Sequence, residues 1–136
     1  MMKRNNFPFS AVLGLNHAKT AILVVLVNPR AGGLLISGPR GIGKSTLMRS
    51  TQELIERPWR DIPVSITEDR LFGTIDTEKA IYSGQKKLYP GIINEADQGV
   101  LYLDDVNLLR EDLLDSILDI AEVGMYQLER DGLSLR

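Results

Sequence analysis

The segment at residues 38–45, GPRGIGKS, most constrains what this chain can fold into. It matches the pattern G-x-x-x-x-G-K-[ST], with an apolar run before it and a helix-compatible run, residues 46–56, after it. Its glycines let backbone N–H groups curl around an anion, and the N-terminus of the following helix points free N–H groups at the same anion. The segment therefore predicts a phosphate-binding loop in an α/β nucleotide-binding fold.

Each part of this loop has an expected role. Lys44 adds a positive charge beside the phosphates, and the Ser45 hydroxyl is the group that holds Mg²⁺ in such loops. Arg40 either touches a phosphate or projects into solvent, and the sequence leaves both alternatives open. We predict that the following residues bind the nucleotide: Gly38, Pro39, Arg40, Gly41, Ile42, Gly43, Lys44, Ser45 and Thr46.

Composition excludes several other classes of protein. The chain has 136 residues, a net charge of −2, no cysteine and a single histidine, His17. Disulfides and thiolate metal sites are therefore excluded, and no overall basic charge invites nucleic acid. The longest apolar run, residues 21–27, is too short to span a bilayer. We expect one cytoplasmic domain that has no membrane span and does not bind nucleic acid.

Apolar periodicity and turn residues predict the elements along the chain. The run 16–27 fits a helix or a strand, and its length favours the helix. The stripe Leu109, Leu113, Ile117 and Ala121 predicts an amphipathic helix. The other predicted elements are strands at 34–37, 62–66 and 100–103, a helix at 46–56, a hairpin at 80–91 turning near Ser83-Gly84, and a hairpin around Asp131-Gly132.

Two acids directly follow the predicted strand at 100–103. Asp104, at the carboxyl end of this strand, can hold the metal or its bound water. Its neighbour Asp105 can orient and deprotonate an attacking water. Paired acids after an apolar strand are weak evidence alone, but together with the phosphate loop they predict a nucleotide hydrolase. The predicted catalytic residues are Lys44 and Asp105, and the predicted metal ligands are Ser45 and Asp104.

The chain resembles the ATPase subunit of magnesium chelatase, an AAA+ protein that drives Mg²⁺ insertion into protoporphyrin IX. The phosphate loop is generic to the superfamily, whereas Thr67-Glu68-Asp69-Arg70 with Gly73-Thr74, and Asp104 to Leu109, are more specific. The other matching segments are Phe7-Pro8-Phe9, Val12-Leu13-Gly14, Gly73-Thr74-Ile75-Asp76, Pro90-Gly91-Ile92-Ile93, Gly99 through Leu109 and Glu129-Arg130-Asp131-Gly132.

The resemblance implies an AAA+ P-loop core, a parallel sheet flanked by helices, with residues 1–136 forming a partial, C-terminally incomplete domain. It implies that Lys44 contacts the β- and γ-phosphates of ATP and that Asn107 helps to organise the site. It also implies a homo-oligomeric ring and association with other chelatase subunits. In this family a sensor strand lies between the phosphate-loop strand and the Asp104 strand. The resemblance ends at Arg136, whereas the family's core continues into this sensor strand, an arginine finger and a helical lid.

The chain departs from the family at one site residue. The family usually has glutamate at the position of Asp105, and the shorter side chain draws the carboxylate back by roughly 1.5 Å, about one C–C bond. Three functions therefore stay open: a chelatase ATPase subunit, a nucleotide-binding or subunit-binding remnant without turnover, and another AAA+ remodeller such as a MoxR-like chaperone. In a chain extended through the missing elements, we expect Asp105→Glu to raise turnover.

Overall fold

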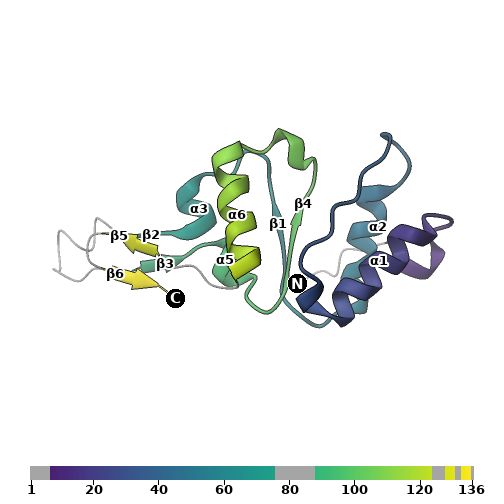
Figure 1. Cartoon of the computed structure of the whole chain (residues 1–136), viewed down its shortest axis with the longest axis horizontal. Helices are drawn as coiled ribbons and strands as arrows, with labels where there is room; N and C mark the ends of the chain where they lie inside the picture. The colour runs from purple at the N-terminus through teal and green to yellow at the C-terminus, as the bar shows by residue number, and fades with distance from the viewer. Residues whose placement is uncertain (1–6, 76–87, 124–127, 131–132, 136) are drawn as a thin grey trace. The chain divides into compact units, whose positions relative to one another are not determined.

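The computed structural model describes residues 7–75, 88–123, 128–130 and 133–135. The chain divides into two compact units, residues 1–56 and 57–136. The first unit contains the phosphate-loop segment, and the second contains every strand of the described chain (Figure 1).

In the first unit, two α-helices flank the phosphate loop. The helix α1 spans Asn16–Val27, which confirms the predicted helix, and α2 spans Lys44–Ser50. Short 3₁₀ turns lie at Phe9–Ala11, Pro29–Ala31 and Thr51–Leu54. Pro29 lies two residues beyond Val27, the last residue of α1, and the Asn28 side chain accepts a hydrogen bond from the Arg30 N–H, which ends the helix in a turn.

A small apolar core holds this unit together. Val12, Ile22 and Leu47 are buried, and Leu47 is completely inaccessible. Ile22 comes from α1 and Leu47 from α2, so the core joins the helix before the loop to the helix after it. The buried Ser50 hydroxyl donates a hydrogen bond of 2.6 Å to the Leu47 carbonyl, which satisfies a polar group inside the unit.

Two expectations in this unit need correction. The predicted strand at 34–37 does not form, because a strand needs hydrogen bonds to a neighbouring strand and no described strand pairs with these residues. The helix predicted at 46–56 begins two residues earlier, ends as an α-helix at Ser50, and continues as a 3₁₀ turn to Leu54. Leu54, at the end of this turn, is exposed.

In the second unit, a parallel pair of strands carries the two acids. The strand β1 spans Trp59–Ile62 and pairs in parallel with β4, Val100–Leu103, with Ile62 opposite Leu103. The strand at 100–103 is confirmed, whereas the strand predicted at 62–66 shares only Ile62 with β1, which begins three residues earlier and ends four residues earlier. Pro63 has no N–H group to donate to a ladder, so β1 ends just before it.

Helices cover one face of this strand pair (Figure 1). The helices are α3 (Glu68–Phe72), α5 (Ile92–Glu95) and α6 (Glu111–Val123), and a 3₁₀ turn at Val106–Leu108 connects β4 to α6. The buried core consists of Ile62, Ile66, Leu71, Ile93, Leu109, Leu113 and Ile117. Burying each such side chain contributes about 1.5–3 kcal/mol. The predicted stripe is buried at Leu109, Leu113 and Ile117, but Leu109 precedes α6 in extended backbone and Ala121 is exposed.

Two antiparallel pairs complete this unit. The strand β2, Gly73–Ile75, pairs with β3, Leu88–Pro90, and β5, Leu128–Arg130, pairs with β6, Leu133–Leu135. The β5–β6 pair confirms the arms of the hairpin predicted around Asp131-Gly132. Both predicted turns, at residues 83–84 and 131–132, lie outside the described residues.

Candidate functional site

The phosphate-loop glycines adopt backbone conformations that other residues rarely take. Gly41 and Gly43 have φ values of +82° and +90°, and Gly38 has φ +158°. A Cβ atom on Gly41 or Gly43 would meet no heavy atom within 4 Å, so glycine is required there for the backbone angle rather than for space. The glycine pattern therefore determines the path of the loop, as the sequence predicted.

Lys44 is held by its own loop. Its Nζ donates hydrogen bonds of 2.7 Å to the carbonyl oxygens of both Gly38 and Pro39. An ammonium group has three donors, so these two contacts leave one donor for an anion. Lys44 is also the first residue of α2, whose first N–H groups lack partners within the helix. The loop thus combines a fixed positive charge with backbone donors, which suits a phosphate group.

The remaining loop side chains differ in exposure. Ser45 is half-buried at the start of α2, whereas Arg40, Ile42 and Thr46 are exposed. The exposed Arg40 fits the solvent-facing alternative of the two left open by the sequence. The half-buried Ser45 lies next to Lys44, so its hydroxyl belongs to the same short stretch as the cation.

The second unit presents the two acids at the carboxyl end of β4. Asp104 is half-buried and follows Leu103 directly, and Asp105 is exposed. Asp105 has φ +51° and ψ +51°, the left-handed conformation, and its carbonyl accepts a 2.8 Å hydrogen bond from the Leu108 N–H. The chain therefore turns sharply at Asp105 into the 3₁₀ turn, and Asn107 is exposed within that turn.

This left-handed turn was not anticipated from the sequence. Its only signal is that aspartate tolerates such a conformation better than most other residues. The carboxyl ends of parallel strands are where α/β folds place their ligands, so the position of both acids agrees with the predicted role.

The two halves of the predicted site belong to different units. Lys44 and Ser45 are brought together in the first unit, and Asp104 and Asp105 in the second. Within the described part of the chain, no group of three or more histidine or acidic side chains is arranged to hold a metal ion. The Ser45 hydroxyl and the Asp104 carboxylate are each the kind of oxygen group that Mg²⁺ accepts as a protein ligand.

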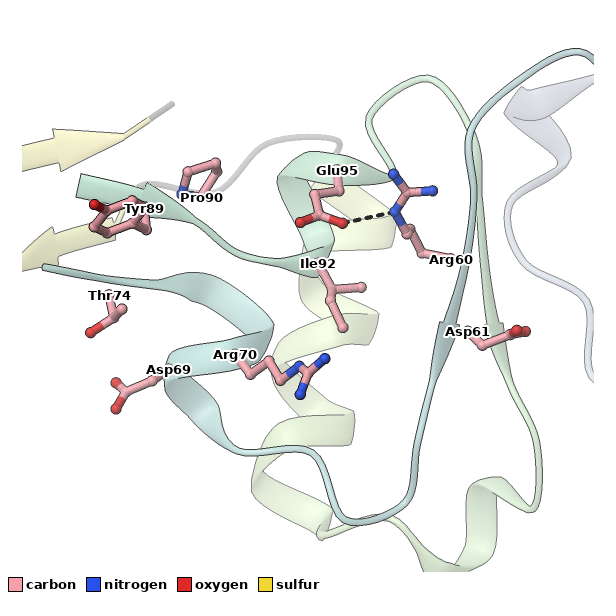
Figure 2. Close-up of a pocket in the computed structure, with 9 residues that line it drawn as sticks. All are labelled: Arg60, Asp61, Asp69, Arg70, Thr74, Tyr89, Pro90, Ile92 and Glu95. Carbon is pink, nitrogen blue, oxygen red and sulfur yellow. Dashed lines mark hydrogen bonds and ion pairs between the residues drawn. The ribbon is translucent and has the colours of Figure 1, made fainter. Parts of the chain in front are cut away.

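A surface hollow of about 420 Å³ lies elsewhere in the second unit, bordered by β1, α3, α5 and the β2–β3 pair (Figure 2). Arg60 Nε donates to Glu95 Oε2 at 2.8 Å across one side of it. Figure 2 shows the Arg70 side chain reaching toward Ile92. The lining residues are Arg60, Asp61, Asp69, Arg70, Thr74, Tyr89, Pro90, Ile92 and Glu95. This hollow contains three carboxylates against two guanidinium groups and no predicted nucleotide-binding residue, so we do not assign the phosphate site to it.

No helix among the described residues is both long and apolar enough to cross a membrane.

Comparison with known proteins defines the class of this chain. The AAA domain (dynein-related subfamily) matches residues 33–134, which include the phosphate loop and both acids. The chain therefore belongs to the AAA family. The glycine-rich loop, the parallel strand pair and the two acids that follow β4 agree with this assignment.

Within that family, the chain is related to subunit I of magnesium chelatase. It is 38% identical to magnesium-chelatase subunit ChlI of Olisthodiscus luteus, over 96% of this chain and 47% of that protein. It is 36% identical to the magnesium-chelatase 38 kDa subunit of Cereibacter sphaeroides, over 96% of this chain and 49% of that protein. The chain thus spans about half the length of the curated relatives it matches.

A solved structure extends this relationship to the fold. The chain matches a structure of the complex between subunits BchI and BchD of magnesium chelatase, with a TM-score of 0.83 and 35% identity. The match covers 97% of this chain and 51% of that one. The resemblance inferred from the sequence motifs is therefore confirmed, and so is the α/β AAA fold class.

Proposed function

We propose that this chain is the nucleotide-binding part of an AAA+ ATPase subunit of the magnesium chelatase type, which uses Mg-ATP to drive Mg²⁺ insertion into protoporphyrin IX. The observation that carries this proposal is the loop in which Lys44 Nζ is held by the Gly38 and Pro39 carbonyls, next to left-handed Gly41 and Gly43. Two relatives that are 38% and 36% identical to this chain are named as magnesium-chelatase subunits, which supports the choice within the AAA family.

Each predicted site residue has a role in this proposal. The backbone of residues 38–46 and the Lys44 ammonium bind the phosphates, and Ser45 and Asp104 hold Mg²⁺. Asp105 orients the attacking water and accepts its proton. The bound Mg²⁺ supplies charge neutralisation at the phosphates.

The partners follow from the relatives. BchI is described in a complex with BchD, and we propose a corresponding chelatase subunit as a partner of this chain. We also propose that copies of this chain assemble into a homo-oligomeric ring, because its resemblance to the chelatase ATPase subunit implies such an assembly. Pull-down of this chain by a BchD-type subunit would test the first of these partners directly.

A second function without turnover is favoured by two specific observations. Asp105 carries a shorter side chain than the usual glutamate, and a misplaced base can cost orders of magnitude in rate. In addition, residues 34–37 form no strand beneath the loop. Under this alternative, the chain binds nucleotide or another subunit but releases no phosphate, so measuring phosphate release alongside binding separates the two functions.

The deciding experiment is a calorimetric titration of the 136-residue chain with Mg-ATP, beside Lys44→Ala, with circular dichroism on the same samples. We expect saturable binding by the unmodified chain and none by Lys44→Ala. Arg30→Ala is the matched control, because it removes an exposed cation of the same unit outside the loop. If Lys44→Ala and the unmodified chain are both folded and bind Mg-ATP with equal affinity, the loop is not the phosphate site.

A further inference from the structure

The helix α1 buries only one of its two apolar faces. Ile22 lies in the core of the first unit, whereas Leu23, Val24 and Val27 on the opposite side are 43%, 53% and 83% exposed. Residues 23, 24 and 27 are neighbours on one helix face because they are spaced by three and four positions. A helix that is apolar on both faces is normally covered on both, so this exposed face, the α1 face, is suited to a partner.

Charge is strongly segregated between the two units. Residues 1–56 contain seven lysines and arginines against two acids, a net charge of +5. Residues 57–136 contain nine lysines and arginines against sixteen acids, a net charge of −7. The overall charge of −2 conceals this difference, so the first unit of one copy and the second unit of another copy carry net charges of opposite sign and attract each other.

The exposed side of α6 complements the α1 face. It presents Asp115, Asp119 and Glu122 with Leu118 and Val123, two apolar side chains that are 57% and 66% exposed. We call these five residues the α6 face. Next to the α1 face, Arg30 is exposed three residues beyond Val27. One face therefore offers apolar side chains beside a cation, and the other offers apolar side chains among carboxylates.

We propose that the α1 face of one copy of this chain binds the α6 face of a second copy. The contact joins two different surfaces, so each copy retains one free face of each kind and further copies can add in the same direction, as in a ring or a filament. This inference deepens the ring assembly proposed above and rests on it, but it requires no nucleotide. The charges steer the encounter and fix the partner, and the apolar side chains supply the buried area.

Sedimentation velocity without nucleotide, over a range of protein concentrations, tests this contact. We expect the unmodified chain to associate with increasing concentration and about tenfold more weakly at 0.5 M salt, where the Debye length falls to about 4 Å. Arg30→Glu alone and Asp119→Arg alone should each weaken association about tenfold, because like charges then meet across the contact. An equimolar mixture of the two variants should associate like the unmodified chain, since every contact in the mixture can again pair opposite charges.

Two further variants complete the design. Val27→Asp should abolish association without unfolding the chain, because Val27 is already 83% exposed. Asp97→Arg is the matched control, since it changes the charge of the same unit by the same amount at an exposed site outside α6. Its association should equal that of the unmodified chain.

The result that would overturn the contact is a monomer at all concentrations, or a mixture that associates no better than its components. Equal weakening by Asp97→Arg would assign the effect to net charge and not to the α6 face. Binding of the α1 face to anionic vesicles or to a BchD-type subunit, without self-association, would also overturn it. A chain that binds Mg-ATP but does not self-associate would contradict the contact and still support the proposed nucleotide site. Failure of the contact is therefore distinguishable from failure of the proposed function.

Discussion

The Lys44 ammonium nitrogen lies 2.7 Å from the carbonyl oxygen of Gly38, six residues earlier in the chain. A second carbonyl, that of Pro39, lies at the same distance, so the cation is fixed by the backbone that surrounds it. The lysine therefore closes the loop and supplies its charge at the same time. Both functions depend on a compact ammonium group on a flexible stem.

Lys44→Arg should keep the charge and still lower affinity for Mg-ATP at least about tenfold. The planar guanidinium is larger than an ammonium group and cannot approach both carbonyls and a phosphate in the same geometry. Calorimetric titration of Lys44→Arg measures this loss, and Lys19→Arg in α1 provides the same substitution outside the loop. An affinity equal to that of the unmodified chain would show that the loop needs only a positive charge.

Asp105 is expected to tolerate some substitutions and not others, because its φ is +51°. Asp105→Asn should leave the free energy of unfolding within about 0.5 kcal/mol, since asparagine also adopts the left-handed conformation readily. Asp105→Val should lower it by about 1–2 kcal/mol, because a β-branched residue is strained there. Urea unfolding measures both values, and equal stability of the two variants would contradict the left-handed turn.

Asp105→Asn also tests the proposed catalytic role of Asp105, because this substitution should leave stability nearly unchanged. If Asp105 is the catalytic base, Asp105→Asn removes phosphate release while Mg-ATP binding persists, since an amide cannot accept the proton. Phosphate release and binding are measured on the same samples. Undiminished phosphate release by Asp105→Asn would exclude the role of base.

Gly91→Ala should destabilise the second unit by about 1–3 kcal/mol. A Cβ atom on Gly91 would lie 2.3 Å from the Leu71 carbonyl oxygen and 2.5 Å from the Gly73 nitrogen, so backbone must move to admit it. Gly33→Ala is the control, because a Cβ atom there meets nothing within 4 Å and the change should stay below about 0.5 kcal/mol. Chemical denaturation of both variants checks the difference, and equal stabilities would disprove the close approach.

Arg110 holds the pKa of Asp112 below its ordinary value of 3.8, chiefly through a side-chain hydrogen bond at the start of α6. Because the pKa is lowered in the folded chain, the interaction stabilises the fold at neutral pH. The stabilisation is lost as the pH falls through the folded-state pKa, below 3.8. Arg110→Ala should raise the pKa of Asp112 toward that ordinary value, as followed by carboxyl NMR titration.

Arg60→Ala is the control for this measurement, since Arg60 is paired with Glu95 instead. It should leave the titration of Asp112 unchanged. A pKa of Asp112 that is the same in Arg110→Ala and in the unmodified chain would contradict the assigned cause.

Local sequence signals predicted much of the fold because they depend on neighbouring residues. The helix at 16–27, the strand at 100–103 and the burial of Leu113 and Ile117 follow from apolar spacing and turn residues. Elements that depend on distant partners were less predictable. Residues 34–37 have strand composition but no pairing strand, and Pro63 ended β1 earlier than its apolar neighbours suggested.

The sequence by itself determined the class of this protein and predicted the residues of its candidate site. The sequence alone identifies the glycine spacing, Lys44 and the acids at the end of β4, because each motif is a continuous run of residues. Only the tertiary structure decided how Lys44 is held by its own loop, that Asp105 turns in the left-handed conformation, and which face of α1 stays exposed. These features depend on backbone angles and on packing between residues far apart in the chain, which a linear pattern does not specify.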